Sequence, residues 1–168
     1  LQQGMDPNTQ DANGSPSLVK AMQLESLRVA QELLQARGIQ IDVPNASRET
    51  ALMQACIKGH IDMVRQLLKM GAKLNHPGWT PLHYAASADT EHSVEIAPLL
   101  LEHHAYIDAE SPNKSTPLML AAQYGSEAMV NLLLSAGADV QLRNQLGLTA
   151  VDFARRSERD FMVQLLEQ

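Results

Sequence analysis

The sequence predicts an all-α solenoid in which helix-turn-helix units stack against one another and project β-hairpin loops. Five similar segments begin 34, 33, 33 and 33 residues apart: "GMDPN", "GIQID", "GAKLN", "HAYID" and "GADVQ". A second series keeps a fixed phase to the first: "SPSLVKA", "ETALMQA", "WTPLHYA", "STPLMLA" and "LTAVDFA". Two series in register indicate a repeat protein. The aromatic share of only 4% favours many thin helical layers over one broad aromatic core.

Each unit is predicted to contain a turn, a short helix, a second turn, a longer helix and an exposed loop. Four short helices are expected to begin at a threonine, because its hydroxyl can accept a hydrogen bond from the first turn: Thr50, Thr80, Thr116 and Thr149. The Pro or Ala that follows suits the first helical position. The longer helices carry apolar residues at helical spacing, as in Met63, Val64, Leu67 and Leu68. Gly71 and Gly137 stand where a left-handed residue can end such a helix.

The repeat organises residues 1–168 as a single domain. We expect a partial unit at 1–10, units at 11–44, 45–76, 77–110 and 111–143, and a C-terminal capping unit at 144–168. The opening "LQQGMDPN" looks like a helix tail and the loop of a unit whose first part is missing, so we expect the native protein to extend further toward its N-terminus. At the other end, charged residues should turn an outer face toward water, as a terminal repeat requires: Arg155, Arg156, Glu158, Arg159 and Asp160.

With these motifs in place, the units resemble ankyrin repeats. The family pattern runs Gly-x-Thr-Pro-Leu-His-x-Ala-Ala, then Gly-His, then Val-x-x-Leu-Leu-x-x-Gly-Ala-Asp-Val-Asn. Residues 114–141 match it nearly in full, and every other unit matches it in part. The stretch "HHAYIDAESPNKSTPLMLAAQYG" is also similar to short ankyrin proteins of proteobacteria. That likeness implies a soluble bacterial protein that is located in either the cytoplasm or the periplasm.

The third unit departs from the pattern in three ways. Its loop between Gly71 and Thr80 is three residues shorter than the neighbouring loops, and the segment between its helices, around 87–93, is three residues longer. Pro98 falls inside its second helix, where proline costs about 3 kcal/mol through a lost hydrogen bond and a clash. We therefore expect this helix to start late or to kink.

Composition argues against several classes of function. A net charge of −6 with scattered Lys and Arg lacks the basic footprint that binds phosphates, so nucleic acid is not an expected partner. No apolar run approaches the roughly 18 residues that would cross a bilayer. Cys56 is the only cysteine and is interpreted as a buried helix residue. Because the sequence has no phosphate-binding loop, nucleophile elbow or carboxylate pair, neither an enzyme nor a cofactor is expected.

Histidines are the remaining candidates for chemistry. In the family the Thr-Pro-Leu-His motif is structural, with threonine and histidine bonding each other and the backbone, and Met53 and Met119 fill the slot of His83 here. We therefore interpret His83 as structural, against the alternatives of a catalytic base or a ligand. His103 and His104 are adjacent and point apart, which argues against zinc. "DPNTQDANG" lacks the glycine and glutamate of a calcium loop and is interpreted as a hairpin turn.

The resemblance also implies a place for a partner, since the hairpin tips and first helices of such solenoids line a concave groove. Carried over, the groove positions are Ala46, Ser47, Glu49, Ile57, Lys58, Trp79, Ser87, Ala88, Pro112, Asn113, Ser115, Gln123, Tyr124, Leu146, Leu148, Arg156 and Ser157. Among them we predict the partner-binding residues Trp79, Tyr124, Lys58, Glu49, Asn113, Gln123 and Arg156. Trp79 and Tyr124 are the strongest candidates, because packing does not require an aromatic residue at either position and because Trp and Tyr are enriched in interface hot spots. The alternative for Trp79 is that it covers the shortened loop beside His76 and Pro77.

These observations predict a non-catalytic scaffold that binds another protein through its groove. The alternative is an accessory or regulatory subunit of a bacterial enzyme, for instance in the periplasm. An enzyme in its own right ranks third, and a deep pocket with converging titratable groups would distinguish it. We expect the chain to be a monomer.

Overall fold

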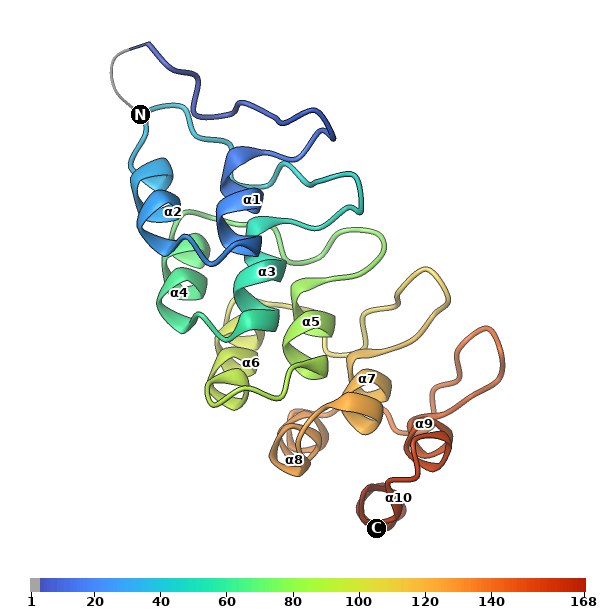
Figure 1. Cartoon of the computed structure of the whole chain (residues 1–168). Coiled ribbons are helices and arrows are strands. Elements are labelled where there is room, and N and C mark those ends of the chain that lie inside the picture. Colours follow the sequence, from blue (N-terminus) through green and yellow to red (C-terminus); the bar gives the residue numbers. More distant parts are fainter. Residues whose placement is uncertain (1–3) are drawn as a thin grey trace.

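The computed structural model describes residues 4–168 and shows two parallel layers of helices (Figure 1). The odd-numbered helices form one layer, the even-numbered helices form the other, and the loops project from the side of the odd-numbered layer. The helices are α1 (Ser17–Gln23), α2 (Leu27–Leu34), α3 (Ala51–Lys58), α4 (Ile61–Lys69), α5 (Pro81–Ser87), α6 (Ser93–Glu102), α7 (Pro117–Tyr124), α8 (Glu127–Ser135), α9 (Ala150–Arg156) and α10 (Asp160–Leu166). The predicted all-α solenoid is confirmed. The helix tail expected at residues 1–3 lies outside the described residues.

The predicted threonine caps are confirmed, since Thr50, Thr80, Thr116 and Thr149 are the residues that precede α3, α5, α7 and α9. Three of their hydroxyls accept a hydrogen bond from the third residue of the helix, at 3.3 Å from Met53 N, 3.4 Å from Met119 N and 3.3 Å from Asp152 N. Gly71 and Gly137 have φ of 84° and 96° just beyond α4 and α8, as expected for residues that end a helix.

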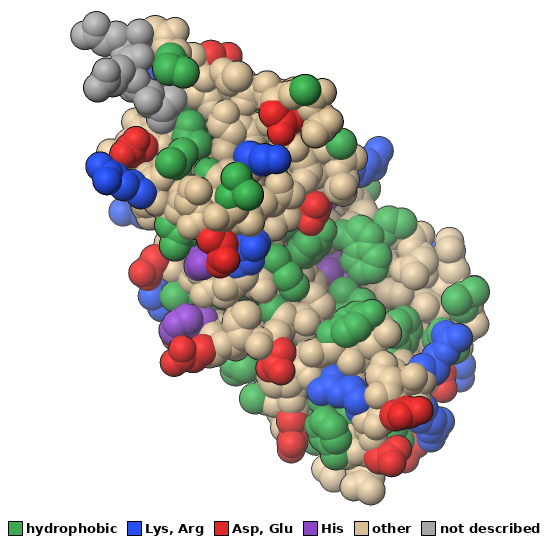
Figure 2. Space-filling view, viewed as in Figure 1, with side chains coloured by type: hydrophobic (Ala, Val, Ile, Leu, Met, Phe, Trp, Pro, Cys, Tyr) green, Lys and Arg blue, Asp and Glu red, His purple; other side chains and the backbone are tan. Residues whose placement is uncertain are grey.

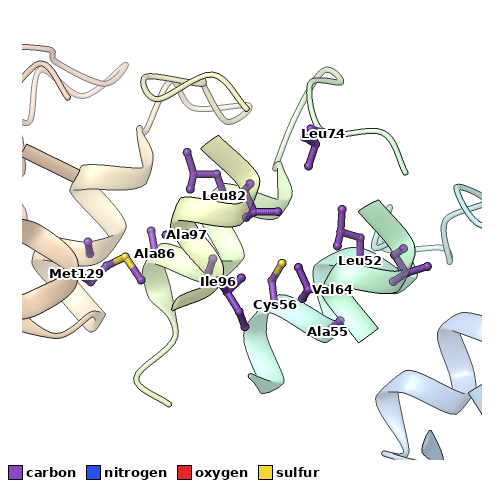
Figure 3. Close-up of a cluster of buried hydrophobic side chains, with 14 of the residues drawn as sticks. Leu52, Ala55, Cys56, Val64, Leu74, Leu82, Ala86, Ile96, Ala97 and Met129 are labelled. Atoms are coloured by element: carbon purple, nitrogen blue, oxygen red, sulfur yellow. The ribbon is translucent and has the colours of Figure 1, made fainter. Parts of the chain in front are cut away.

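The core runs the length of the stack between the two layers, and Figure 3 shows one part of it. Both layers contribute large apolar side chains, such as Leu82 from α5 and Ile96 from α6, and the odd-numbered helices add small residues between them. Ala55, Cys56 and Ala86 are fully buried there. Burial raises the pKa of the Cys56 thiol, so it stays protonated and unreactive, in line with its interpretation as a packing residue.

A ladder of side-chain hydrogen bonds joins each loop to the next. Asn8, Asp42, Asn75 and Asp108 occupy equivalent positions, and each side-chain oxygen accepts a backbone N–H from the following loop. The donors are Gln40 at 2.8 Å, Lys73 at 2.9 Å, Tyr106 at 2.9 Å and Asp139 at 3.0 Å. Within residues 4–168 the loops form no regular strand, and the one antiparallel bridge joins Gln10 and Pro16. The loops are therefore aligned by side-chain hydrogen bonds, whereas the strands of a β-sheet are aligned by backbone hydrogen bonds.

His83 links the third unit to the fourth, as its structural interpretation requires. The Thr80 N–H donates to His83 Nδ1 at 3.1 Å, so the ring proton is on Nε2, which donates to the Ser115 carbonyl at 2.8 Å. The side chain is fully buried, and burial lowers the pKa of His83 from its usual value of 6.5. A buried neutral imidazole with both nitrogens occupied is a structural cross-link.

Arg159 corrects one expectation about the charged C-terminal segment. Arg155, Arg156, Glu158 and Asp160 are exposed, but Arg159 is half-buried and turns toward α7. Its guanidinium donates to the carbonyls of Ala121 at 3.3 Å, Ala122 at 3.0 Å and also Gly125. The last carbonyls of a helix lack partners within the helix and carry partial negative charge, so a cation is stabilising there. Arg159 thus joins the last unit to the fourth.

The expected late start of the helix around Pro98 is wrong. Helix α6 begins at Ser93 and continues unbroken through Pro98 to Glu102. Its start is held by Ser93, whose hydroxyl donates to the Thr90 carbonyl at 2.6 Å and accepts from the Thr90 N–H at 3.0 Å. Ile96, Ala97 and Leu100 are fully buried, and this packing offsets the hydrogen bond that proline cannot make. The longer connection before α6, residues 88–92, is as expected.

His83→Met should lower the free energy of unfolding by about 1–3 kcal/mol, because the Ser115 carbonyl loses its donor inside the core. Methionine is the matched replacement, since it fills the same slot in two other units. Urea denaturation measures the change, and His103→Met, at an exposed histidine, is the control, expected to stay within about 0.5 kcal/mol of wild type. Equal stability of the two variants would contradict the cross-link.

His83 also predicts a pH dependence. Its pKa is lower in the folded protein than in the unfolded chain, so the unfolded state binds the extra proton first as pH falls. The stability contributed by the neutral ring is therefore fully present above about pH 6.5 and declines as pH falls through that value. We expect the free energy of unfolding of wild type to drop more steeply than that of His83→Met between about pH 7 and about pH 5. Parallel curves would show that His83 does not contribute.

Arg159→Met should lower the free energy of unfolding by about 2 kcal/mol, since it keeps the apolar stem but removes the donors to two carbonyls of α7 and to that of Gly125 just beyond it. The matched control is Arg156→Met, because Arg156 is exposed and lies in the same segment. Thermal and urea denaturation of both variants check the expectation. A loss of stability in the control as large as in Arg159→Met would mean that charge, rather than the contacts with α7, is responsible.

Candidate functional site

The concave side of the molecule has an apolar hollow between α3, α5 and α7. Its volume is about 590 Å³, and it is lined by Ile57, Trp79, His83, Tyr84, Ser87, Leu120 and Tyr124. Figure 2 shows hydrophobic side chains gathered at the middle of this face, with charged side chains more frequent around it. We call this the aromatic hollow. It brings together four of the predicted groove residues, namely Ile57, Trp79, Ser87 and Tyr124.

Trp79 stands immediately before the cap residue of α5 and is 38% exposed. Its ring meets the imidazole of His83 edge to face, with centroids 5.3 Å apart and an interplanar angle of 82°. Such a contact favours one orientation of the indole. Because His83 is itself fixed by two hydrogen bonds, Trp79 is held in place although it remains partly exposed to solvent.

Tyr124, the last residue of α7, is 58% exposed. The residue after it, Gly125, lies so close to α5 that an added Cβ would be 2.5 Å from the Ala86 carbonyl oxygen. Only glycine permits this approach of the third and fourth units. The close contact places Tyr124 beside the end of α5, where it faces Ser87 and Trp79 across the aromatic hollow.

Tyr84 and Leu120 were missed by the sequence analysis. Both stand four residues after the capping threonine, in the middle of the first helix of their units, whereas the prediction considered only the loop and the helix end. Tyr84 donates its hydroxyl to Glu49 Oε2 at 3.2 Å. Burial, together with the charge of Glu49, raises the pKa of Tyr84 to about 12. The repeat register could have identified both residues, because Gln54, Tyr84 and Leu120 occupy the same position in successive units.

The predicted residue Glu49 does not line the aromatic hollow itself but is bonded to Tyr84, which does. Besides the Tyr84 hydroxyl, its carboxylate accepts hydrogen bonds from Gln54 Nε2 at 2.9 Å and Asn45 Nδ2 at 3.2 Å. Three donors around this half-buried carboxylate hold it in place, and it in turn fixes the hydroxyl of Tyr84.

The remaining predicted residues do not line the aromatic hollow: Lys58, Asn113, Gln123 and Arg156. Lys58 ends α3 and Gln123 precedes Tyr124, and both are half-buried, while Arg156 is an exposed residue at the end of α9. Asn113 has a structural contact, since its carbonyl accepts the Gln145 N–H at 2.9 Å and so joins two loops. The seven residues therefore do not form one cluster.

A second hollow, of about 690 Å³, lies between the loops on the other side of Trp79. It is lined by residues of 42–50 and 73–79 and by Pro112. The other four loops each contain a five-residue turn closed by a backbone hydrogen bond, at Asp11–Ser15, Asn45–Glu49, Ser111–Ser115 and Asn144–Leu148. Among the described residues, the shorter α4–α5 loop has no such turn. We call the resulting gap in the row of loops the loop notch.

The metal-binding and membrane-spanning features weighed in the sequence analysis can be compared with the described residues. Within 4–168, no three His, Cys, Asp or Glu residues come together in a way that could hold a metal ion. The segment 6–14 is a turn in which Asp11 Oδ1 accepts the N–H groups of Asn13 and Ser15 at 2.9 Å and 3.0 Å. Over the same range, every helix is too short or too polar to traverse a bilayer.

Comparison with known proteins places these features in a family. The sequence matches the family model described as "Ankyrin repeats (3 copies)" over residues 1–77, 18–111, 73–144 and 91–168. Human transient receptor potential cation channel subfamily A member 1 is 32% identical over 148 residues, covering 83% of this chain and 13% of that protein. Human ankyrin repeat and SOCS box protein 16 is 40% identical over 122 residues, covering 70% of this chain and 26% of that protein. Protein glp-1 of Caenorhabditis elegans is 28% identical over 184 residues, covering 100% of this chain and 14% of that protein.

The chain thus spans about a quarter or less of the length of these relatives. All three are animal proteins, so the expected likeness to proteobacterial members is not confirmed by them. The family models cover the whole sequence, and ankyrin repeats are in general protein–protein interaction modules that are typically non-catalytic. From its repeat period, its stacked helix pairs and these matches, the chain belongs to the ankyrin-repeat family.

Proposed function

We propose that this chain is a non-catalytic scaffold that binds a partner protein on its concave face, with the aromatic hollow at the centre of the contact. The observation that carries the proposal is the hollow itself. Trp79, Tyr84 and Tyr124 surround an open space of about 590 Å³ in a chain with only six aromatic residues. Aromatic side chains around a concave pocket are the usual anchors of protein interfaces.

The chemistry of the hollow supports binding over catalysis. A general base must offer a free lone pair to its substrate near neutral pH. The nitrogens of His83 are occupied by Thr80 and Ser115, and the Tyr84 hydroxyl, with a pKa of about 12, already donates to Glu49. These titratable side chains are thus committed to holding the wall of the hollow in place.

The hollow is also preformed, which favours affinity. Trp79 rests on a fixed imidazole, Tyr84 is bonded to Glu49, and Gly125 locks α7 against α5. Binding to such a surface loses less conformational entropy than binding to a mobile one. The predicted residues Lys58 and Gln123 then belong to the half-polar border around the aromatic centre, with Arg156 further along the groove.

The double variant Trp79→Ala, Tyr124→Ala should lose at least about 30-fold in affinity for a groove-binding partner, because removal of even one hot-spot side chain worth about 2 kcal/mol weakens binding by that factor. Partners are captured from an extract of the source cells by the immobilised chain and identified by mass spectrometry, and their affinities are then measured by calorimetry. The control is Val29→Ala, because Val29 is 50% exposed on α2, away from the groove. Retention of the same partners by wild type and the double variant would exclude the aromatic hollow as the binding site.

A further inference from the structure

The loop notch adjoins the aromatic hollow, and its chemistry is different. Arg48 and Lys73 line the notch, and their charged groups have no carboxylate within 4.0 Å among residues 4–168. Asp42 is the one carboxylate in the lining, and its Oδ1 accepts the Lys73 backbone N–H at 2.9 Å. The chain as a whole has a net charge of −6, whereas the lining of the loop notch carries two cations and one carboxylate and is therefore locally positive.

The backbone conformation at Arg48 is a second observation that supports a role for its charge in binding. Each of the four regular loop turns has one residue in the left-handed region at the same position, and the first and last turns use glycine there, at Gly14 and Gly147. The turns on either side of the shortened α4–α5 loop use Arg48, with φ of 62°, and Lys114, with φ of 61°. A residue with a Cβ costs about 1 kcal/mol more than glycine in this conformation. The two loops next to the notch thus carry basic side chains at a position where glycine would be less strained.

Trp79 connects the two hollows, because its indole lines both of them. A single extended stretch of chain could therefore occupy both at once, with one side chain on each side of the indole. The apolar hollow beside Tyr84 and Tyr124 suits an aromatic or large aliphatic side chain. The notch between Arg48 and Lys73 suits a carboxylate, which both cations can reach as hydrogen-bond donors.

From these observations we infer that the groove recognises an extended segment of its partner in which an Asp or Glu lies within a few residues of a large apolar side chain. The carboxylate sits in the loop notch with Arg48 and Lys73, and the apolar side chain fills the aromatic hollow across Trp79. This inference rests on the proposed function and specifies the chemistry of the partner. The shortening of the third loop, which opens the notch, then gives the site its selectivity for acidic segments.

The test is selection of random short peptides displayed on phage by three forms of the chain. These are wild type, the notch variant Arg48→Glu, Lys73→Glu, and the control Arg37→Glu, Lys69→Glu, which changes net charge equally at exposed residues outside both hollows. Wild type and control should enrich peptides with an acidic residue close to a large apolar one. The notch variant should keep the apolar preference and lose the acidic one.

Affinity then follows from the fluorescence of Trp79, the only tryptophan in the chain. A synthetic peptide from the selection should bind about fivefold more tightly than its Glu→Gln counterpart, and the difference should vanish near 1 M salt, where screening acts within about 3 Å. Apolar peptides without an acidic preference, or an acidic preference that survives in the notch variant, would overturn this inference alone. If the Trp79→Ala, Tyr124→Ala variant selects the same peptides as wild type, the proposed function itself fails.

Discussion

The close approach of neighbouring first helices is the constraint on which the rest of the structure depends. A Cβ at Gly125 would lie 2.5 Å from the Ala86 carbonyl oxygen of the neighbouring first helix, and a Cβ at Gly59, which follows α3, would lie 2.4 Å from the Thr90 hydroxyl in the α5–α6 connection. Only very small residues permit these contacts, which is why Ala and Gly recur on this layer. Since each unit buries its apolar faces against its neighbours, the spacing of the helices also determines how far apart the loops and the groove residues lie.

That spacing brings polar groups of adjacent units within hydrogen-bonding distance. The carboxamides and carboxylates of Asn8, Asp42, Asn75 and Asp108 reach the backbone of the next loop, and His83 reaches the Ser115 carbonyl. Arg159 does the same at the far end by binding the last carbonyls of α7. Each bond is individually modest, but together they orient the loops with little help from sheet structure. A groove built this way is fixed before any partner arrives.

The third unit combines the irregular features of the repeat with the candidate site. Its shorter loop opens the loop notch, its motif supplies the Trp79–His83 pair, and its first helix supplies Tyr84. In a regular repeat, successive units present nearly equivalent surfaces. Selectivity for one partner therefore has to come from units that depart from the repeat pattern. Here the departure places an apolar hollow and a basic gap beside one indole, and under the proposed function a partner would make two different contacts within a short stretch.

The sequence by itself determined the architecture, because a period of 33 residues and the caps at Thr50, Thr80, Thr116 and Thr149 are local signals that repeat. It also predicted a structural role for His83 and a place in the groove for Trp79 and Tyr124, since those predictions need only the register of the repeat. Only the tertiary structure decided which groove residues meet. Tyr84 and Leu120 join Trp79 through contacts between units, and Asn113 is used within the loops instead. Likewise, local propensity does not predict that α6 continues through Pro98, which is stabilised by the burial of Ile96 and Leu100. Nor does it predict that Arg159 binds carbonyl groups at the end of α7 instead of lying in solvent. Both outcomes depend on neighbours distant in sequence, whose positions follow from the stacking of units.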